Sequence, residues 1–259
     1  MKTALSIAGS DSSGGAGIQA DIKTMSALGV YAMSAITAIT AQNTLGVQGV
    51  QAVSPEMVAQ QIDSVFSDIR PDAVKIGMLC NEGIVRTIAE RLKYYQAQHV
   101  VLDTVILSTS GRELLDANGV QALREELLPL AEIVTPNLPE VAYLSGVHEI
   151  HDQNGMVTAA KALSCDAAVL VKGGHLADVA DDLLYVNDEC HWFRMERIDV
   201  RNTHGTGCTL SSAIAAGLAM GYDVVQAVAM AKKYITEILR HDPQLGHGNG
   251  PLNHFAARL

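Results

Sequence analysis

The sequence is short of cysteine, of aromatic side chains and of basic residues, and each shortage argues against a class of protein. The four cysteines are scattered without CxxC spacing, which argues against a zinc site and against a disulfide framework. Aromatic residues make up 4% of the chain, a composition that suits helices packed on a sheet better than an all-β sandwich. The formal net charge is −10 and no run of lysine or arginine is present, so we expect no nucleic-acid partner.

Long hydrophobic runs are missing as well. The chain begins with one early lysine, Lys2, and a short apolar stretch that ends at Ser10, which fits neither a signal peptide nor a membrane span. We therefore expect a cytoplasmic protein with no membrane partner and with reduced cysteines. With 259 residues, 48% of them hydrophobic and 18% charged, the chain can build one large globular domain over residues 1–259.

Apolar strands and amphipathic helices alternate along the chain. Residues 3–8 form an apolar run that leads into a glycine-rich loop at 9–17 and then into apolar residues at helical spacing. The order recurs, with predicted strands at 31–40, 73–77, 99–105, 133–135 and 167–172, a hairpin formed by 182–186 and 190–195, and helices that include 118–130, 156–163, 209–220 and 224–239. This alternation predicts right-handed βαβ units and an α/β fold with a mostly parallel central sheet.

Candidate ligand-binding residues follow several of the predicted strands. In an open α/β sheet, ligands bind beyond the carboxyl ends of the strands, where loops and helix N-termini gather. The residues that share this placement are Asp11, Asp21, Gln42, Met78, Asp103, Asn137, Glu140, Lys172 and the segment 205–208. Because these separate motifs converge on one edge of the sheet, they predict a single binding site there.

The segment 203–209 (THGTGCT) runs directly into an apolar helical stretch rich in small residues. Its small residues Gly205, Thr206 and Gly207 let a ligand approach the backbone, and the exposed N–H groups at the start of a helix can hold an anion. Cys208 would lie at the positive end of that helix, where the thiolate is favoured, which makes it the first catalytic candidate. The alternative is that Cys208 packs at the start of the helix as a small buried hydrophobic residue.

The loop at 9–17 is not a P-loop and does not match GxGxxG cleanly. Its hydroxyl groups and the carboxylate of Asp11, beside four glycines, favour a ligand cradle over a flexible turn. A third possible function, that of a nucleotide-dependent oxidoreductase, is supported by this loop alone. The nine histidines show no ligand spacing, so we expect no zinc, and we expect His204 to be a loop or packing residue.

Asn137 and Glu140 have two interpretations. Asparagine followed three residues later by glutamate is the spacing of a capping box at the start of a helix. Alternatively, Glu140 organises Mg²⁺ and its waters against phosphate oxygens, because hard cations prefer carboxylate and water. Lys172 ends an apolar strand. Either the strand simply leaves the core through a turn at this point, or the lysine binds a phosphate.

Taken together, the motifs resemble the hydroxymethylpyrimidine and phosphomethylpyrimidine kinases of thiamine biosynthesis, which belong to the ribokinase-like superfamily. The resemblance covers nearly the whole chain and is carried by residues 8–21, 40–44, 75–79, 135–140, 171–175, 203–209 and 246–255. It implies a ribokinase-like three-layer α/β sandwich and ATP-dependent phosphorylation, first of the hydroxymethyl group and then of the resulting monophosphate. It also implies a homodimer.

The resemblance further implies roles for individual residues. The pyrimidine pocket would be lined by Gly9, Ala16, Asp21, Gln42, Met78 and Val105. ATP would contact Asn137, Lys172 and Thr206, and Mg²⁺ would be held by Glu140 and Asp103. The backbone of Gly205, Thr206, Gly207 and Cys208 would stabilise charge on the transferred phosphoryl group. Cys208, where most of the superfamily has aspartate, either removes the proton of the substrate hydroxyl or positions that hydroxyl.

One position departs from the family pattern. Many relatives read Asp-Pro-Val-Met where this chain has Asp-Thr-Val-Ile at 103–106, and the loss of proline at Thr104 frees the backbone and restores an N–H donor. The ring pocket is therefore where substrate preference can change, and the alternative function is a pyridoxine or pyridoxal kinase. A catalytically silent pyrimidine-binding protein is a second alternative.

Overall fold

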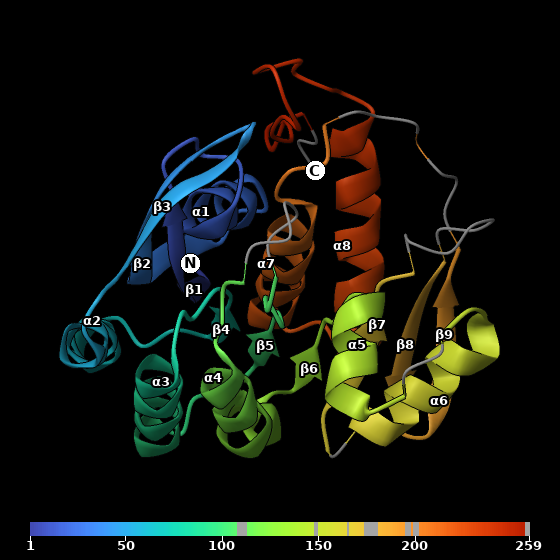
Figure 1. The fold of residues 1–259 in the computed structure, drawn as a ribbon, viewed down its shortest axis with the longest axis horizontal. Coiled ribbons are helices and arrows are strands. Elements are labelled where there is room, and N and C mark those ends of the chain that lie inside the picture. The colour runs from blue at the N-terminus through green and yellow to red at the C-terminus, as the bar shows by residue number, and fades with distance from the viewer. Residues whose placement is uncertain are drawn as a thin grey trace.

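The computed structural model describes residues 1–107, 113–147, 150–164, 166–173, 181–194, 198 and 202–256. These residues build one sheet with the strand order β3-β2-β1-β4-β5-β6-β7-β8-β9 (Figure 1). The strands are β1 (Thr3–Asp11), β2 (Tyr31–Asn43), β3 (Gly46–Ala52), β4 (Ala73–Ile76), β5 (Val100–Leu102), β6 (Ile133–Val134), β7 (Ala168–Val171), β8 (Asp182–Val186) and β9 (Glu189–Phe193).

The centre of the sheet is parallel and its edges are antiparallel. Strands β2, β1, β4, β5, β6 and β7 pair in parallel. Strand β3 pairs antiparallel with β2 at one edge, and β8 and β9 pair antiparallel at the other. The predicted α/β fold with a mostly parallel sheet is confirmed, and so is the hairpin around 187–188.

Helices cover both faces of the sheet, so the molecule has three layers (Figure 1). Helices α1 (Gly17–Ala27), α7 (Thr206–Ala219) and α8 (Val224–Leu239) pack together on one face. The other face carries α2 (Pro55–Asp68), α3 (Glu82–Tyr95), α4 (Ala117–Ala122), α5 (Leu138–Ser145) and α6 (Gln153–Leu163).

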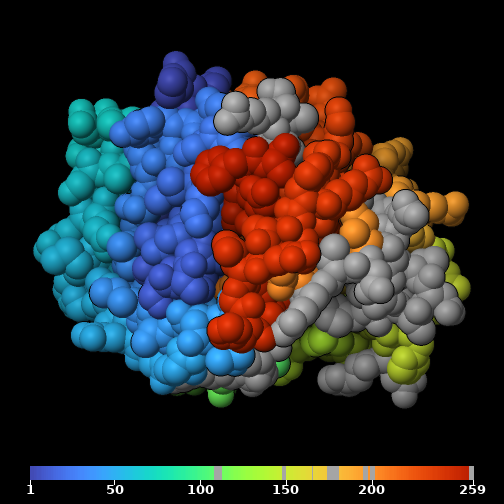
Figure 2. Space-filling model, turned by 90° about the horizontal axis from the view of Figure 1, so that it is seen from above, coloured from blue at the N-terminus to red at the C-terminus, as the bar shows by residue number. Residues whose placement is uncertain are grey.

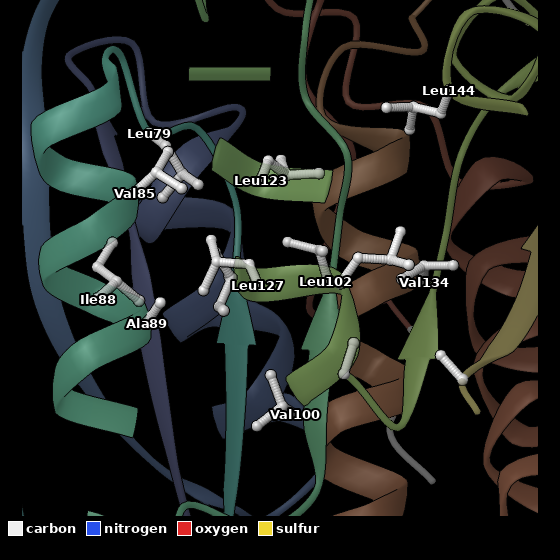
Figure 3. Close-up of a cluster of buried hydrophobic side chains, with 14 of the residues drawn as sticks. Leu79, Val85, Ile88, Ala89, Val100, Leu102, Leu123, Leu127, Val134 and Leu144 are labelled. Atoms are coloured by element: carbon white, nitrogen blue, oxygen red, sulfur yellow. The ribbon is translucent and has the colours of Figure 1, made fainter. Parts of the chain in front are cut away.

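The core is divided between the two faces by the alternation of side chains along each strand. In β5, Val100 and Leu102 belong to the cluster beneath α3, where they meet Val85, Ile88, Leu123 and Leu127 (Figure 3). Val101, between them, belongs to the cluster beneath α7. The strands are apolar on both faces because both faces are covered, which is why they read in the sequence as continuous apolar runs.

Three predicted boundaries need correction. Strand β1 continues through Gly9 to Asp11, because its last residues still pair with β2 after a register shift. Helix α7 begins at Thr206 and not at 209, since Gly205 is its N-cap. The helix predicted at 118–130 is only α-helical over 117–122; a π-helical turn at 123–127 and a 3₁₀ turn at 128–130 follow, as Pro129 excludes regular α-helical bonding there.

Strand β2 is only partly buried, because buried residues such as Ala38 and Thr40 alternate with exposed ones toward its end. It extends to Asn43 as one arm of a hairpin with β3, and Ile39 is exposed on it. Residues 174–175 of the predicted motif and residue 195 of the predicted hairpin lie outside the described residues, as does the polar segment 108–112. Among the residues the structure describes, no helix has the length and apolar character needed to cross a membrane.

Candidate active site

The residues predicted to form the site are brought to one edge of the sheet by the ends of its parallel strands. Asp11 ends β1, Met78 follows β4, Asp103 follows β5, and Lys172 follows β7. Asn137, which follows β6, pairs with Lys172 through an isolated bridge between the two loops. The N-terminus of α7 approaches the same edge, so the convergence predicted from the sequence is present.

The start of α7 is a tight turn that packs against the glycine loop. Gly205 adopts a φ of 84°, and a methyl group at this position would overlap the carbonyl oxygen of Gly15. The carbonyl of Gly205 accepts the first helical bond, from the N–H of Thr209 at 2.9 Å, and the Thr206 hydroxyl donates to the carbonyl of Thr203 at 2.7 Å. The Thr206 N–H donates to the carbonyl of Thr203 at 3.2 Å, so the N–H groups of Gly207 and Cys208 are the ones that an anion can accept from at the start of the helix.

A lysine and an aspartate lie over this first turn. Lys172 Nζ is 3.1 Å from Asp103 Oδ1, and a methyl group at Gly207 would lie 3.5 Å from the same Nζ. Asp103 also accepts hydrogen bonds of 3.1 Å from the hydroxyls of Thr135 and Ser211. Burial alone would raise the pKa of Asp103, but the positive charges of Lys172 and Lys75 lower it below its usual value. The site therefore holds a cation and a carboxylate beside N–H donors.

The capping-box interpretation of Asn137 and Glu140 is what the structure contains. The Asn137 side chain accepts from the Glu140 N–H, and Glu140 Oε2 accepts from the Asn137 N–H, both at 2.9 Å. Glu140 Oε2 also accepts from the Thr104 hydroxyl at 3.1 Å, so Thr104 supports this carboxylate. Burial raises the pKa of Glu140, and Lys172 opposes this effect. These contacts use only one of the two Glu140 carboxylate oxygens, so the other is left for a metal ion. Binding of Mg²⁺ by Glu140 therefore stays a prediction.

The residues predicted to line the ring pocket lie in two groups. Gly9 and Met78 are neighbours, because a methyl group at Gly9 would lie 3.1 Å from Met78 Sδ. Met78 also borders a hollow of about 260 Å³ whose other walls are Val50, Cys80 and residues 113–116. Ala16 lies against Gly205, and Gln42 faces His204. Val105 is half-buried directly after Asp103 and Thr104.

Asp21 does not line the pocket, which corrects its predicted role. The side chain is fully buried, and its carboxylate receives Lys75 Nζ at 2.9 Å on both oxygens. The hydroxyls of Ser6 and Ser212 donate to it at 2.6 and 2.7 Å. Four hydrogen bonds occupy the carboxylate, so Asp21 ties β1, β4 and α7 together below the site and makes no surface for a ligand.

The expectation that Cys208 favours the thiolate is wrong for the protein as described. Burial raises the pKa of the Cys208 thiol to about 11, and the nearby charge of Lys75 offsets this only in part because Asp21 and Asp103 act against it. Desolvation of the anion is thus the largest influence on this thiol. The direction of this shift favours the protonated thiol, although the side chain is half-buried and not fully enclosed.

Sequence reasoning missed two residues that support the site. Lys75 stands in the four-residue buried strand AVKI, and a lysine in such a strand is a signal that a buried carboxylate must pair with it. His204 was expected to be a loop residue, but its Nε2 lies 2.9 Å from Asp11 Oδ2. Nothing in the sequence indicates this pair, because 193 positions separate the two residues.

Comparison with known proteins agrees with this geometry. Residues 11–253 match the family described as phosphomethylpyrimidine kinase. A hydroxymethylpyrimidine/phosphomethylpyrimidine kinase of Rhizobium meliloti is 51% identical over 257 residues, or 97% of this chain and 96% of the relative. The crystal structure of phosphomethylpyrimidine kinase from Clostridium difficile 630 is 45% identical, with a TM-score of 0.82 over 92% of this chain and 99% of that one. An ADP complex of Bacillus subtilis pyridoxal kinase is 39% identical, with a TM-score of 0.90 over 99% and 98%.

Proposed function

The chain belongs to the phosphomethylpyrimidine kinase family, and from this premise we propose that it phosphorylates 4-amino-5-hydroxymethyl-2-methylpyrimidine and then its monophosphate, with ATP as phosphoryl donor. It is a kinase with the ribokinase-like α/β fold. The single observation that supports the chemistry best is the approach of Lys172 and Asp103 to the first turn of α7. Phosphoryl transfer is catalysed mainly by positioning and by charge stabilisation, and this arrangement supplies both.

The pyrimidine is favoured over pyridoxal as the substrate. The curated relatives at about half identity are named for the pyrimidine reactions, including a bifunctional thiamine biosynthesis protein of Geobacter sulfurreducens that is 48% identical and about twice as long. Two pyridoxal kinase structures, from Bacillus subtilis and Staphylococcus aureus, are 39% and 32% identical. In the site, Gln42 carries an amide that can both donate to and accept from an aminopyrimidine edge.

We place Mg²⁺ at Asp103 and Glu140. Among the described residues no three carboxylate, histidine or cysteine side chains gather as a metal-binding group. Mg²⁺ bound with a nucleotide commonly uses one or two protein carboxylates plus phosphate oxygens and water, so two carboxylates fit it. When bound, Mg²⁺ neutralises charge on the phosphates. Asn137, Lys172 and Thr206 are proposed to contact ATP, and Ala16, Met78, Gly9 and Val105 to enclose the pyrimidine.

The decisive experiment is a measurement of ATP consumption with hydroxymethylpyrimidine, its monophosphate and pyridoxal side by side, with the mass of each product. We expect two successive phosphate additions to the pyrimidine. Turnover of pyridoxal alone would move the function to a vitamin B6 kinase on the same fold. Binding of the pyrimidine without consumption of ATP would instead support a silent binding protein.

We propose that Cys208 acts as a neutral thiol that positions the substrate hydroxyl. With a pKa of about 11, roughly one thiol in 10⁴ is ionised at pH 7. We expect Cys208→Ala to lower kcat by less than about 10²-fold, below the usual range for loss of a general base. The KM for ATP should change less than kcat.

The pH profile separates the two roles of Cys208. A required thiolate would make kcat rise about tenfold per pH unit up to about pH 11, because each unit increases the ionised fraction tenfold. We expect instead that kcat between pH 7 and 9 has the same shape for the wild type and for Cys208→Ser, whose hydroxyl does not ionise there. A unit slope in the wild type alone would establish Cys208 as the base.

A further inference from the structure

The side chain of His204 lies between two polar groups of the site. The ring nitrogen Nε2 of His204 is 2.9 Å from Asp11 Oδ2. The terminal amide of Gln42 also faces this ring nitrogen. The amide atom nearest to it, which is assigned as the amide nitrogen, lies 3.1 Å away. His204 and Asp11 are largely buried, with side-chain exposures of 13% and 3%. The three side chains come from the start of α7, the end of β1 and the end of β2, so only the folded protein brings them together.

Asp11 is a carboxylate that can only accept hydrogen bonds. Its oxygens receive the N–H and hydroxyl of Ser13 at 2.8 Å each, the N–H of Gly15 at 3.1 Å and the N–H of Ala16 at 2.8 Å. Burial opposes ionisation, but these bonds and the one to His204 lower the pKa of Asp11 to about 2. The short contact with His204 therefore requires the proton to be on Nε2 of the ring.

This proton determines which end of the Gln42 amide faces the ring. A protonated Nε2 has no lone pair to accept a bond, so an amide nitrogen at 3.1 Å would set one donor against another. The oxygen and nitrogen of an amide are told apart only by their hydrogen-bond partners. With the oxygen toward His204, the Nε2–H is shared between Asp11 and Gln42.

Thr40 gives an independent reason for the same orientation. Its hydroxyl lies 2.9 Å from the carbonyl of Ser10 and 3.3 Å from the other end of the Gln42 amide, placed as Oε1. One hydroxyl proton cannot serve both acceptors. If that end of the amide is the nitrogen, it donates to the Thr40 oxygen while the Thr40 proton goes to Ser10.

We propose that His204 is a specificity-determining positioning residue, whose Nε2–H, held by Asp11, fixes the Gln42 amide with its oxygen toward His204 and its nitrogen toward Thr40. One N–H and one carbonyl lone pair of the amide then remain for a ligand. Their complement is a heteroaromatic ring with an amino group beside a ring nitrogen. The inference deepens the proposed function and rests on it for the identity of the ring.

The surroundings of both residues hold this arrangement in place. Ser12 fixes the backbone of Gln42, since its hydroxyl donates to the Gln42 carbonyl at 2.8 Å and accepts from the Gln42 N–H at 2.9 Å. The backbone N–H of His204 donates to the carbonyl of Gly250 at 3.1 Å. Gly250 lies in the carboxy-terminal segment, which is seen from above beside the amino-terminal part of the chain (Figure 2).

The first test locates the proton directly in the ligand-free protein. Nitrogen-15 NMR of the histidine side chains, with His204 assigned from its absence in His204→Gln, should show a protonated Nε2. An unprotonated Nε2 in His204 would overturn the proposal. This measurement does not depend on the reaction, so it remains informative even if the wild type fails to phosphorylate a pyrimidine, which would overturn the proposed function instead.

The second test couples His204 to the amino group of the substrate. In the wild type, replacing the amino group of hydroxymethylpyrimidine by hydrogen should raise KM about tenfold, because an amide group of the site loses its partner. His204→Leu should raise the KM for the intact pyrimidine by a similar factor and reduce the penalty for the missing amino group to less than about threefold, with the KM for ATP unchanged. An equal penalty in both proteins would contradict the proposal.

Two further variants separate the role of the donor from a general structural effect. His204→Gln keeps an N–H donor and should restore most of the affinity for the pyrimidine. Gly15→Ala should act like His204→Leu, since its methyl group would lie 2.6 Å from His204 Cδ2 and displace the ring. His241→Leu, at an exposed position beyond α8, is the control and should leave every constant unchanged.

Discussion

Replacing Gly205 with alanine should lower kcat by about 10²-fold or more, the loss expected when N–H donors to a developing charge are displaced. Gly205 is the N-cap of α7 and adopts a φ of 84°, a conformation that costs an L-residue about 1 kcal/mol or more. An added methyl group would also overlap the Gly15 carbonyl oxygen. The first turn of α7 must then move away from the glycine loop, and its N–H groups move with it. Steady-state kinetics with ATP and the pyrimidine measure the effect.

Gly221 provides a matched control for this variant. It lies just beyond the other end of α7 and also has a positive φ, of 93°, but a methyl group there would meet no atom within 4 Å. Gly221→Ala carries the backbone cost alone, so we expect a modest loss of stability and an unchanged kcat. Circular dichroism and thermal unfolding show whether each variant is folded. A Gly205→Ala protein that is folded and fully active would show that this turn does not handle the phosphoryl group.

Replacing Lys75 with methionine should destabilise the protein by about 3–5 kcal/mol, the cost of removing one partner from a buried ion pair. Lys75 and Asp21 both have side-chain exposures of 0%. Burial would lower the pKa of Lys75, but the charges of Asp21 and Asp103 raise it, so the lysine is charged in the folded protein. Without it, the Asp21 carboxylate stays buried with only the hydroxyls of Ser6 and Ser212. Urea unfolding measures the change in free energy.

Two companion variants show where that loss originates. In Lys75→Met/Asp21→Asn the unpaired charge is gone, so a large part of the stability should return. Lys2→Met removes a lysine from an exposed pair with Asp72, where the exposures are 53% and 33%, and should cost less than about 1 kcal/mol. If Lys75→Met were no more destabilising than Lys2→Met, the buried pair would not be what joins β4 to α1.

The position of Lys75 follows from the alternation of side chains in β4. Val74 and Ile76 face the cluster beneath α3, whereas Ala73 and Lys75 face the helices α1 and α7. Asp21 is on α1 and Ser212 is on α7, so the three side chains join the sheet to both helices that carry the site. The pair therefore couples the stability of the fold to the position of the first turn of α7.

Thr104 donates its hydroxyl to Glu140 at 3.1 Å. A proline there would supply no hydroxyl, so the chain uses this position to support a predicted metal ligand. Threonine at position 104 therefore acts on Glu140, in addition to the ring pocket and the neighbouring Asp103.

The sequence by itself determined the class of fold, the edge of the sheet that carries the site and the family. Apolar runs of strand length alternating with amphipathic helices require a parallel sheet, and the carboxyl ends of parallel strands must share one edge. Residues such as Asp103, Lys172 and Gly205 could therefore be placed at the site before any contact was known. The capping box of Asn137 and Glu140 was equally accessible, because it is a local pattern of four residues.

Only the tertiary structure decided which partners these residues have. Strand alternation shows that Lys75 faces α1 and α7, but the choice of Asp21, 54 positions away, depends on how those helices pack on the sheet. The same holds for His204 and Asp11, and for the raised pKa of the Cys208 thiol, which depends on neighbours that no local pattern reveals. Periodicity specifies which face a side chain occupies, whereas its hydrogen-bond partner and its charge depend on neighbours that are distant in the sequence.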